Sequence, residues 1–264
     1  MNVQTLFSVA GKTALVTGGS RGIGYMIAEG FLSSGAKVYI SARKKEACDA
    51  AAKELAKFGE CISIPADVTT NEGRAQLVDE IKKRESKLDI LVNNAGAAWG
   101  APIADFPESG FDKVMDTNVK AVFFLTRDLL PLLEKAGSHG NPARVINIGS
   151  IDGIQVPNIE TYPYSASKAA VHHMTRVLAV RLGGKNITVN AIAPGPFESK
   201  MTEWLLSEHG KEIVAQCPLK RIGQPSDMAG VALYLASPAG SYTNGAVIPV
   251  DGGICISTLH NSPI

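Results

Sequence analysis

Two side chains with acid–base chemistry, Tyr164 and Lys168, stand four residues apart in the segment Tyr-Ser-Ala-Ser-Lys. Positions i and i+4 of a helix share one face, with Cβ atoms about 5–6 Å apart. A cation about 4 Å from a phenol, at an effective dielectric constant of about 20, contributes on the order of 4 kcal/mol, or roughly three pK units. Because a free phenol titrates at about pH 10, the spacing predicts that Lys168 lowers the pKa of Tyr164 close to physiological pH.

A serine upstream adds a group suited to the reduction of a carbonyl. Ser150 follows the apolar run Val145–Ile148, where its hydroxyl could bond a carbonyl oxygen while Tyr164 protonates that oxygen. Hydride delivered to the carbonyl carbon would complete the reaction. Tyr162 is interpreted as a packing residue, because Ala166 and not a cation stands four residues later.

A glycine-rich stretch at 17–24, Thr-Gly-Gly-Ser-Arg-Gly-Ile-Gly, predicts the binding of a dinucleotide. It follows an apolar run and opens a helical pattern, which is the context in which such a motif is informative. Glycine lets the chain turn sharply and approach a pyrophosphate, whose charge is favoured by the N-terminus of the following helix. The residues predicted to form this cradle are Gly18, Ser20, Gly22 and Gly24.

The end of the second apolar run indicates which dinucleotide binds. Proteins that bind NAD usually carry an acid there to hold the ribose 2′-hydroxyl, but this chain has Ser41-Ala42-Arg43. Arg43, together with Arg21 of the glycine-rich stretch, offers guanidinium groups that suit a 2′-phosphate. The sequence therefore predicts NADP(H) as the cofactor.

Composition narrows the classes of partner. The chain has 264 residues and a net charge of +1, so it has no field to recruit nucleic acid or an anionic membrane, and a small-molecule carbonyl or alcohol substrate is expected. No signal-like or membrane-spanning stretch appears, which favours the cytoplasm. The cysteines lack ligand spacing, and His172 and His173 point about 100° apart on a helix, so no metal is expected and both histidines are interpreted as ordinary surface or packing residues.

Short apolar runs alternate with helical periodicity along one expected domain, 1–264. Because the runs are continuously apolar, the strands are expected to be buried on both faces. The pattern predicts an α/β, Rossmann-type doubly wound fold, a seven-stranded parallel sheet with helices on both faces. The expected strands are Ala14–Thr17, Val38–Ser41, Cys61–Ile64, Ile90–Asn93, Val145–Ile148, Thr188–Ile192 and Ala246–Val250. The expected helices are Ile23–Leu32, Ala47–Phe58, Ala75–Ile81, Phe111–Leu133 interrupted at Pro131, and Pro163–Leu182.

The motifs, taken in order, resemble the short-chain dehydrogenase/reductase family. They are the glycine pattern, Asn-Asn-Ala-Gly at 93–96, Ser150, Tyr-x-x-x-Lys at 164–168 and Pro-Gly at 194–195. The resemblance extends over essentially the whole chain and, within the family, is greatest to bacterial 3-oxoacyl reductases, including the rhamnolipid-pathway type. It implies NADPH-dependent reduction of a ketone to a secondary alcohol, with a 3-oxoacyl thioester or a similar apolar carbonyl compound as substrate.

The resemblance also implies roles for individual positions. Asn118 would hold a water in a proton relay, Lys168 would bind ribose hydroxyls, and Asp67 and Val68 would flank the adenine. Ser199 stands where the family usually has a threonine that bonds the nicotinamide amide. The remaining cofactor contacts that it implies are Ile23, Asn94, Tyr164, Pro194, Gly195 and a backbone group of Phe197.

Several alternatives stay open. The segment 197–216, which contains Trp204, is expected to form either an apolar lid over the site or a helix packed on the core or on a neighbouring subunit. Carbonyl or polyol reduction and steroid-type dehydrogenation are alternative activities, and a non-catalytic dinucleotide-sensing protein is a further one, although such a protein should have lost part of Ser150, Tyr164 and Lys168. The family implies a homotetramer, and the tail 256–264 either reaches a neighbour or frays.

Overall fold

A parallel sheet forms the central layer of the protein. In the computed structural model, which describes residues 2–257, seven strands lie in the order β3-β2-β1-β4-β5-β6-β7, and each neighbouring pair is parallel. This order confirms the predicted doubly wound sheet. The strands are β1 (Thr13–Thr17), β2 (Lys37–Ser41), β3 (Cys61–Ser63), β4 (Ile90–Asn93), β5 (Ala143–Ile148), β6 (Ile187–Pro194) and β7 (Val247–Val250).

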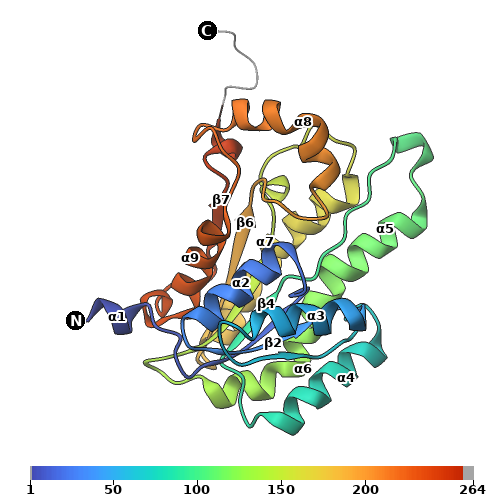
Figure 1. Cartoon of the computed structure of the whole chain (residues 1–264). Coiled ribbons are helices and arrows are strands. Elements are labelled where there is room, and N and C mark those ends of the chain that lie inside the picture. Colours follow the sequence, from blue (N-terminus) through green and yellow to red (C-terminus); the bar gives the residue numbers. More distant parts are fainter. Residues whose placement is uncertain (1, 258–264) are drawn as a thin grey trace.

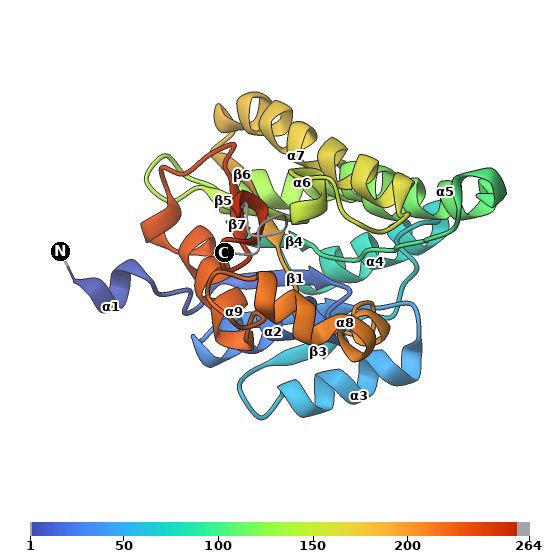
Figure 2. The same cartoon turned by 90° about the horizontal axis from the view of Figure 1, so that it is seen from above.

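Helices cover both faces of this sheet. The α-helices of the described residues are α1 (Val3–Leu6), α2 (Gly22–Ser33), α3 (Lys45–Leu55), α4 (Asn71–Arg84), α5 (Glu108–Met115), α6 (Ala121–Ala136), α7 (Tyr162–Gly183), α8 (Glu203–Gln216) and α9 (Pro225–Ala236). Figure 2 shows α4, α6 and α7 on one side of the strands and α2, α3 and α9 on the other. Figure 1 shows α8 above β6 and β7, at the top of the molecule.

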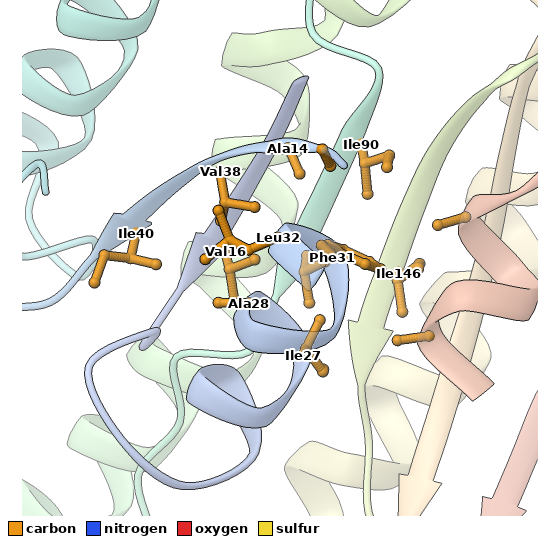
Figure 3. Packing of buried hydrophobic residues seen from close by; sticks show 14 of the residues in the cluster. Ala14, Val16, Ile27, Ala28, Phe31, Leu32, Val38, Ile40, Ile90 and Ile146 are labelled. Carbon is orange, nitrogen blue, oxygen red and sulfur yellow. The ribbon is translucent and has the colours of Figure 1, made fainter. Parts of the chain in front are cut away.

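Successive residues of the strands feed two separate cores, because side chains alternate between the faces of a sheet. In β1, Ala14 and Val16 pack with Phe31 of α2, as Figure 3 shows, whereas Leu15 belongs to the opposite core with Leu129 of α6. All of these side chains are fully buried. The continuous hydrophobicity of the strands is therefore the consequence of helical cover on both faces.

The region from Glu108 to Ala136 differs from the single helix expected there. A π-helical turn at Asp116–Lys120 separates α5 from α6, and α6 continues through Pro131 to its end. The predicted interruption at Pro131 is wrong. Because Pro131 has no N–H, the backbone carbonyl of Arg127, four residues earlier, loses its helical hydrogen bond. Arg127 lies on the exposed side of α6, where water can take the place of the missing donor.

Buried amides hold the carboxyl ends of the central strands in place. Asn93 Nδ2 at the end of β4 donates to Asn147 Oδ1 at 2.9 Å and to Thr126 Oγ1 of α6 at 3.0 Å. Asn147 Nδ2 of β5 donates in turn to Thr175 Oγ1 of α7 at 2.9 Å. Since buried polar groups are costly when unpaired, this chain of bonds fixes the register of both helices against the strands that lead into the site.

Two further features bear on the sequence predictions. No described helix is both long and apolar enough to cross a membrane. Contact with a neighbour and fraying both stay open for the tail 256–264, because residues 258–264 lie outside the described part of the chain.

Candidate active site

The site lies where β1 and β4 end side by side, at the switch point of the sheet. Thr17 at the end of β1 receives the backbone N–H groups of Asn94 and Ala95 on its hydroxyl, each at 3.0 Å. Asn94 Nδ2 donates back to the carbonyls of Thr17 at 2.8 Å and of Gly18 at 3.1 Å. Asn94 therefore joins the glycine loop to the end of β4.

The glycine loop needs its glycines for shape. Gly18 and Gly22 have φ angles of +65° and +55°, in the left-handed region, and a Cβ at Gly24 would lie 2.4 Å from the Gly18 carbonyl oxygen. The helix that begins at Gly22 has no side-chain cap and no acid in its first turn, so its N–H groups stay available to an anion. Ser20 and Ile23, beside these glycines, are half-buried. These features fit the pyrophosphate of a dinucleotide.

The two arginines predicted to select NADP(H) are accessible. Arg43 follows the end of β2, Arg21 precedes α2, and both side chains are exposed. Neither belongs to an ion pair among residues 2–257, whereas Lys45 nearby is paired with Asp49 at 2.5 Å. Free guanidinium groups at this edge fit a 2′-phosphate.

The residues predicted to flank the adenine lie after β3. Asp67 Oδ1 accepts hydrogen bonds from the backbone N–H of Thr69 at 3.0 Å and from its hydroxyl at 2.7 Å, so the carboxylate shapes the turn before α4. Val68 is 6% exposed. Both side chains are thus engaged in the local fold, and their contact with adenine stays a prediction.

Ser150, Tyr164 and Lys168 come together beside β5. Lys168 Nζ lies 5.5 Å from the centre of the Tyr164 ring, and the Ser150 hydroxyl lies close enough to the Tyr164 phenol to act on its pKa. Lys168 Nζ also donates to the carbonyl of Ile148, the last residue of β5, at 2.8 Å. Pro163 sits in the first turn of α7, where proline is tolerated, and the pair four residues apart follows on one face.

This group adjoins the cofactor crevice. A Cβ at Gly96 would lie 3.8 Å from Lys168 Nζ and 3.5 Å from Asn118 Oδ1. Gly96 follows Asn94, which bonds the glycine loop. The short segment after β4 thus brings the two halves of the predicted site within contact of one another.

The predicted lowering of the Tyr164 pKa is wrong for this structure. Burial raises the pKa of Tyr164 to about 12, and the neighbouring Ser150 hydroxyl opposes this rise only in part. Burial also lowers the pKa of Lys168 to about 8. The arithmetic from spacing left out the removal of both groups from water, which penalises the phenolate and the ammonium alike. Tyr164 is therefore a protonated phenol at neutral pH.

Asp152 is a residue that the sequence analysis missed. Burial raises its pKa, and its negative charge raises the pKa of both Tyr164 and Lys168. Its backbone N–H donates to Ser150 Oγ at 3.1 Å. The only signal in the sequence is its place two residues after Ser150, which does not show on its own that the carboxyl faces the site.

Asn118 lies in the π-helical turn and is 2% exposed. Its Nδ2 donates to the carbonyl of Ala97 and to Ser167 Oγ, both at 2.9 Å, and its Oδ1 accepts from the N–H of Ala97 at 2.8 Å. Both Nδ2 hydrogens are used by these partners, whereas Oδ1 keeps a second lone pair. A water held at this position would bond either Oδ1 or the backbone of the π-helical turn, a kind of turn that is frequent at functional sites.

The loop after β6 closes the site from the other side. Pro194 ends β6, and the N–H of Gly195 donates to the carbonyl of Val250 at 2.9 Å. A Cβ at Gly22 would lie 3.1 Å from Ser199 Cβ, so this loop meets the glycine loop. Gly195 itself packs on Asp251.

Thr202 organises this loop and was not predicted. Its hydroxyl donates to the carbonyl of Phe197 at 2.6 Å and lies 2.9 Å from Ser199 Oγ. Phe197 is 2% exposed, with its ring packed on Gly223. Phe197 and Ser199 thus stand beside the glycine loop, but the Phe197 carbonyl and the Ser199 hydroxyl already have a partner within the chain.

Known proteins resemble this chain over most of its length. A family model described as enoyl-(acyl carrier protein) reductase matches residues 18–255. The chain is 49% identical over 249 residues to a rhamnolipid biosynthesis 3-oxoacyl-(acyl-carrier-protein) reductase of Pseudomonas aeruginosa, which covers 94% of this chain and 97% of that protein. It is also 36% identical over 261 residues to gluconate 5-dehydrogenase of Gluconobacter oxydans, and this match covers 97% of this chain and 100% of that protein.

A solved structure agrees as well. The active-site complex of Pseudomonas aeruginosa RhlG with NADP superposes with a TM-score of 0.93 at 48% identity, over 97% of this chain and 100% of that one. The relatives match this chain in sequence and in fold over nearly its full length. The chain belongs to the short-chain dehydrogenase/reductase family.

Proposed function

We propose that the protein reduces a ketone to a secondary alcohol with NADPH, and that the ketone is a 3-oxoacyl thioester or a similar apolar carbonyl compound. The observation that supports this most is the convergence of Ser150, Tyr164 and Lys168 next to the glycine loop. The relative that is 49% identical is described as a 3-oxoacyl reductase, and RhlG was solved with NADP.

Each side chain of the site has a separate role in the proposed reduction. When bound, the reduced nicotinamide supplies a hydride. The Ser150 hydroxyl orients the carbonyl oxygen, and Tyr164, protonated at neutral pH, gives its phenolic proton to that oxygen as negative charge develops. The Lys168 ammonium stabilises the phenolate that remains. Gly18, Gly22 and the N-terminus of α2 hold the pyrophosphate, and Arg21 and Arg43 hold the 2′-phosphate.

The substrate binds under a lid in this proposal. We infer one dinucleotide-binding domain whose segment 197–216 closes over the site. None of the residues of α8 within it is buried, and Trp204 is 66% exposed. An apolar side chain left in water on a helix next to the site suits contact with an apolar acyl chain.

One assay tests the substrate class. Purified protein is given NADPH with 3-oxoacyl thioesters, β-keto esters, keto sugar acids and cyclic ketones, and the loss of NADPH absorbance is followed. We expect the 3-oxoacyl thioesters to give the highest kcat/KM. Turnover confined to keto sugar acids would instead favour polyol reduction, the activity that the description of the Gluconobacter relative suggests.

Cofactor choice provides the first prediction. Arg43→Ala should lower the ratio of kcat/KM with NADPH to kcat/KM with NADH by about tenfold or more, because a charge-assisted hydrogen bond to phosphate contributes about 1.5–3 kcal/mol. Steady-state kinetics with both cofactors measure the ratio. Lys53→Ala, at an exposed cation of α3 well along the helix, is the control. An unchanged ratio in Arg43→Ala would remove Arg43 from the site.

The dependence of kcat/KM on pH provides the second prediction. Stabilising the phenolate requires a charged Lys168, whose pKa is about 8, so kcat/KM for reduction should fall as the pH rises through about 8. Asp152 raises that pKa, so Asp152→Asn should move the midpoint of the fall to lower pH. Profiles of kcat/KM from about pH 6 to about pH 10 measure both effects. Asp105→Asn, at an exposed acid, should leave the midpoint in place, and an unmoved midpoint in Asp152→Asn would contradict the assignment.

We also propose a cytoplasmic homotetramer. Apolar side chains exposed on α6 and α7 support an interface between copies, since Phe123 is 41%, Val177 46% and Val180 79% exposed. Light scattering of the purified protein measures the number of subunits, and a monomeric mass would exclude this assembly.

A further inference from the structure

His172 lies two helical turns after Tyr164 and one turn after Lys168, on the inner face of α7. It is 4% exposed, whereas His173 beside it is exposed. The two rings therefore diverge, as predicted from their adjacency. His172, however, points toward the segment that carries Ser150, which the sequence alone did not indicate.

The backbone that carries Ser150 wraps around this imidazole. A Cβ at Gly149 would lie 2.1 Å from His172 Nε2, and a Cβ at Gly153 would lie 2.9 Å from its Cε1. Real Cβ atoms are not found so close, so both positions need glycine. The imidazole occupies the space between these two glycines, and residues 149 to 153 pack closely around it.

A hydrogen bond connects the ring to the catalytic segment. The backbone N–H of Ser150 donates to His172 Nε2 at 3.4 Å. Nε2 can accept only in a neutral ring, with the proton on Nδ1. Burial, together with the charges of Lys168 and Arg176, lowers the pKa of His172 to about 4. The ring is therefore neutral at the pH where the reduction runs.

Two successive turns of α7 thus hold the exit of β5. Lys168 Nζ binds the carbonyl of Ile148 at 2.8 Å, and His172 Nε2 binds the N–H of Ser150. The hydrogen-bonded ends of this short segment leave little freedom to the Ser150 side chain, which is 7% exposed and accepts the N–H of Asp152 on its Oγ at 3.1 Å.

We propose that His172 is a positioning residue for reduction: it accepts the Ser150 N–H and thereby sets where the Ser150 hydroxyl meets the carbonyl oxygen. This proposal rests on the proposed function, because it gives His172 an effect on kcat only if Ser150 orients the ketone. A small displacement of an orienting group is enough to slow a reaction by one to two orders of magnitude, about 10²-fold for roughly 1 Å.

Three substitutions at His172 separate positioning from simple packing. The amide of His172→Gln reaches the place of Nε2, the amide of His172→Asn reaches only the place of Nδ1, and His172→Leu fills space without an acceptor. We expect kcat to fall about tenfold or more in the Asn and Leu variants and to stay within about threefold of wild type in the Gln variant. The Kd for NADPH should stay within about twofold in all of them, because the cofactor crevice is held by Thr17 and Asn94. His173→Leu, at the exposed neighbour, should match wild type.

The three substitutions at His172 give different results for a positioning role and for simple packing. Equal losses in the Gln and Asn variants, or a kcat within about twofold of wild type in His172→Leu, would overturn the proposal. If His172→Leu does not fold, the comparison of Gln with Asn decides alone. A wild-type protein that consumes no NADPH with any ketone would instead count against the proposed function, so the two failures are told apart.

Discussion

Tyr164→Phe is expected to abolish measurable reduction while leaving the cofactor bound. Removing one oxygen takes away the phenolic proton that the proposed mechanism delivers to the ketone, and a positioned acid contributes about 10²–10⁴-fold to a rate. The pKa of Tyr164, about 12, means that wild-type enzyme carries this proton at every pH used in an ordinary assay. We expect kcat to fall by about 10³-fold or more and the Kd for NADPH to change by less than about twofold.

Tyr162→Phe is the matched control for this change. Tyr162 stands two residues earlier on α7, is 42% exposed and donates its hydroxyl to Glu160 at 2.8 Å. The same atom is removed from the same helix, without contact to Ser150 or Lys168. We expect wild-type kinetics for Tyr162→Phe. Substantial turnover by Tyr164→Phe, measured by single-turnover oxidation of bound NADPH, would show that the proton comes from another group.

Gly24→Ala should abolish tight binding of NADPH. The added methyl would lie 2.4 Å from the Gly18 carbonyl oxygen and 2.4 Å from Asn94 Nδ2, and these two atoms are themselves hydrogen-bonded at 3.1 Å. The glycine loop must therefore move away from the pyrophosphate. Losing two charge-assisted hydrogen bonds of about 1.5 kcal/mol each raises the Kd by about 100-fold. Calorimetric titration of NADPH measures it.

Gly230→Ala controls for the loss of a glycine as such. Gly230 lies in α9 and, apart from its own helix backbone, no atom stands within 4 Å of the position of its added Cβ, so alanine should be accepted and should favour the helix by up to about 1 kcal/mol. We expect unchanged affinity for NADPH. A Gly24→Ala protein that keeps its circular dichroism spectrum and binds NADPH within about threefold of wild type would contradict the assigned cradle.

The central strands, which stand out in the sequence as short apolar runs, were predicted well. The run at 90–93 coincides with β4, and the run at 38–41 lies one residue inside β2. Both strands are buried on two faces, so nearly all of their inner residues are apolar and carry the signal. By contrast, α9 was not expected, although Pro225 stands in its first turn and the Asp227 carboxylate accepts the N–H of Gln224 at 2.8 Å. Its buried residues Met228 and Ala232 pack on α2, a contact that no local pattern announces.

The site itself was predictable as a set of residues but less so in its electrostatics. Spacing alone places Lys168 beside Tyr164, and the structure has them so. The direction of the Tyr164 pKa depends on how much water the surrounding fold removes, and on Asp152, neither of which spacing contains. Thr202 and His172 were missed for a similar reason, since each acts through a partner that only the fold brings near.

The π-helical turn at Asp116–Lys120 has a consequence for how chains of this kind should be aligned. Such a turn holds one residue more than the α-helical turn it replaces, and each helical residue is rotated by about 100° from the last. Deleting one residue there would restore an ordinary helix, yet it would swing Asn118 out of reach of Ala97 and Ser167, to which it is bonded. A homologue with a one-residue gap at this point would therefore lack the buried hydrogen bonds of Asn118, although its length differs by a single residue.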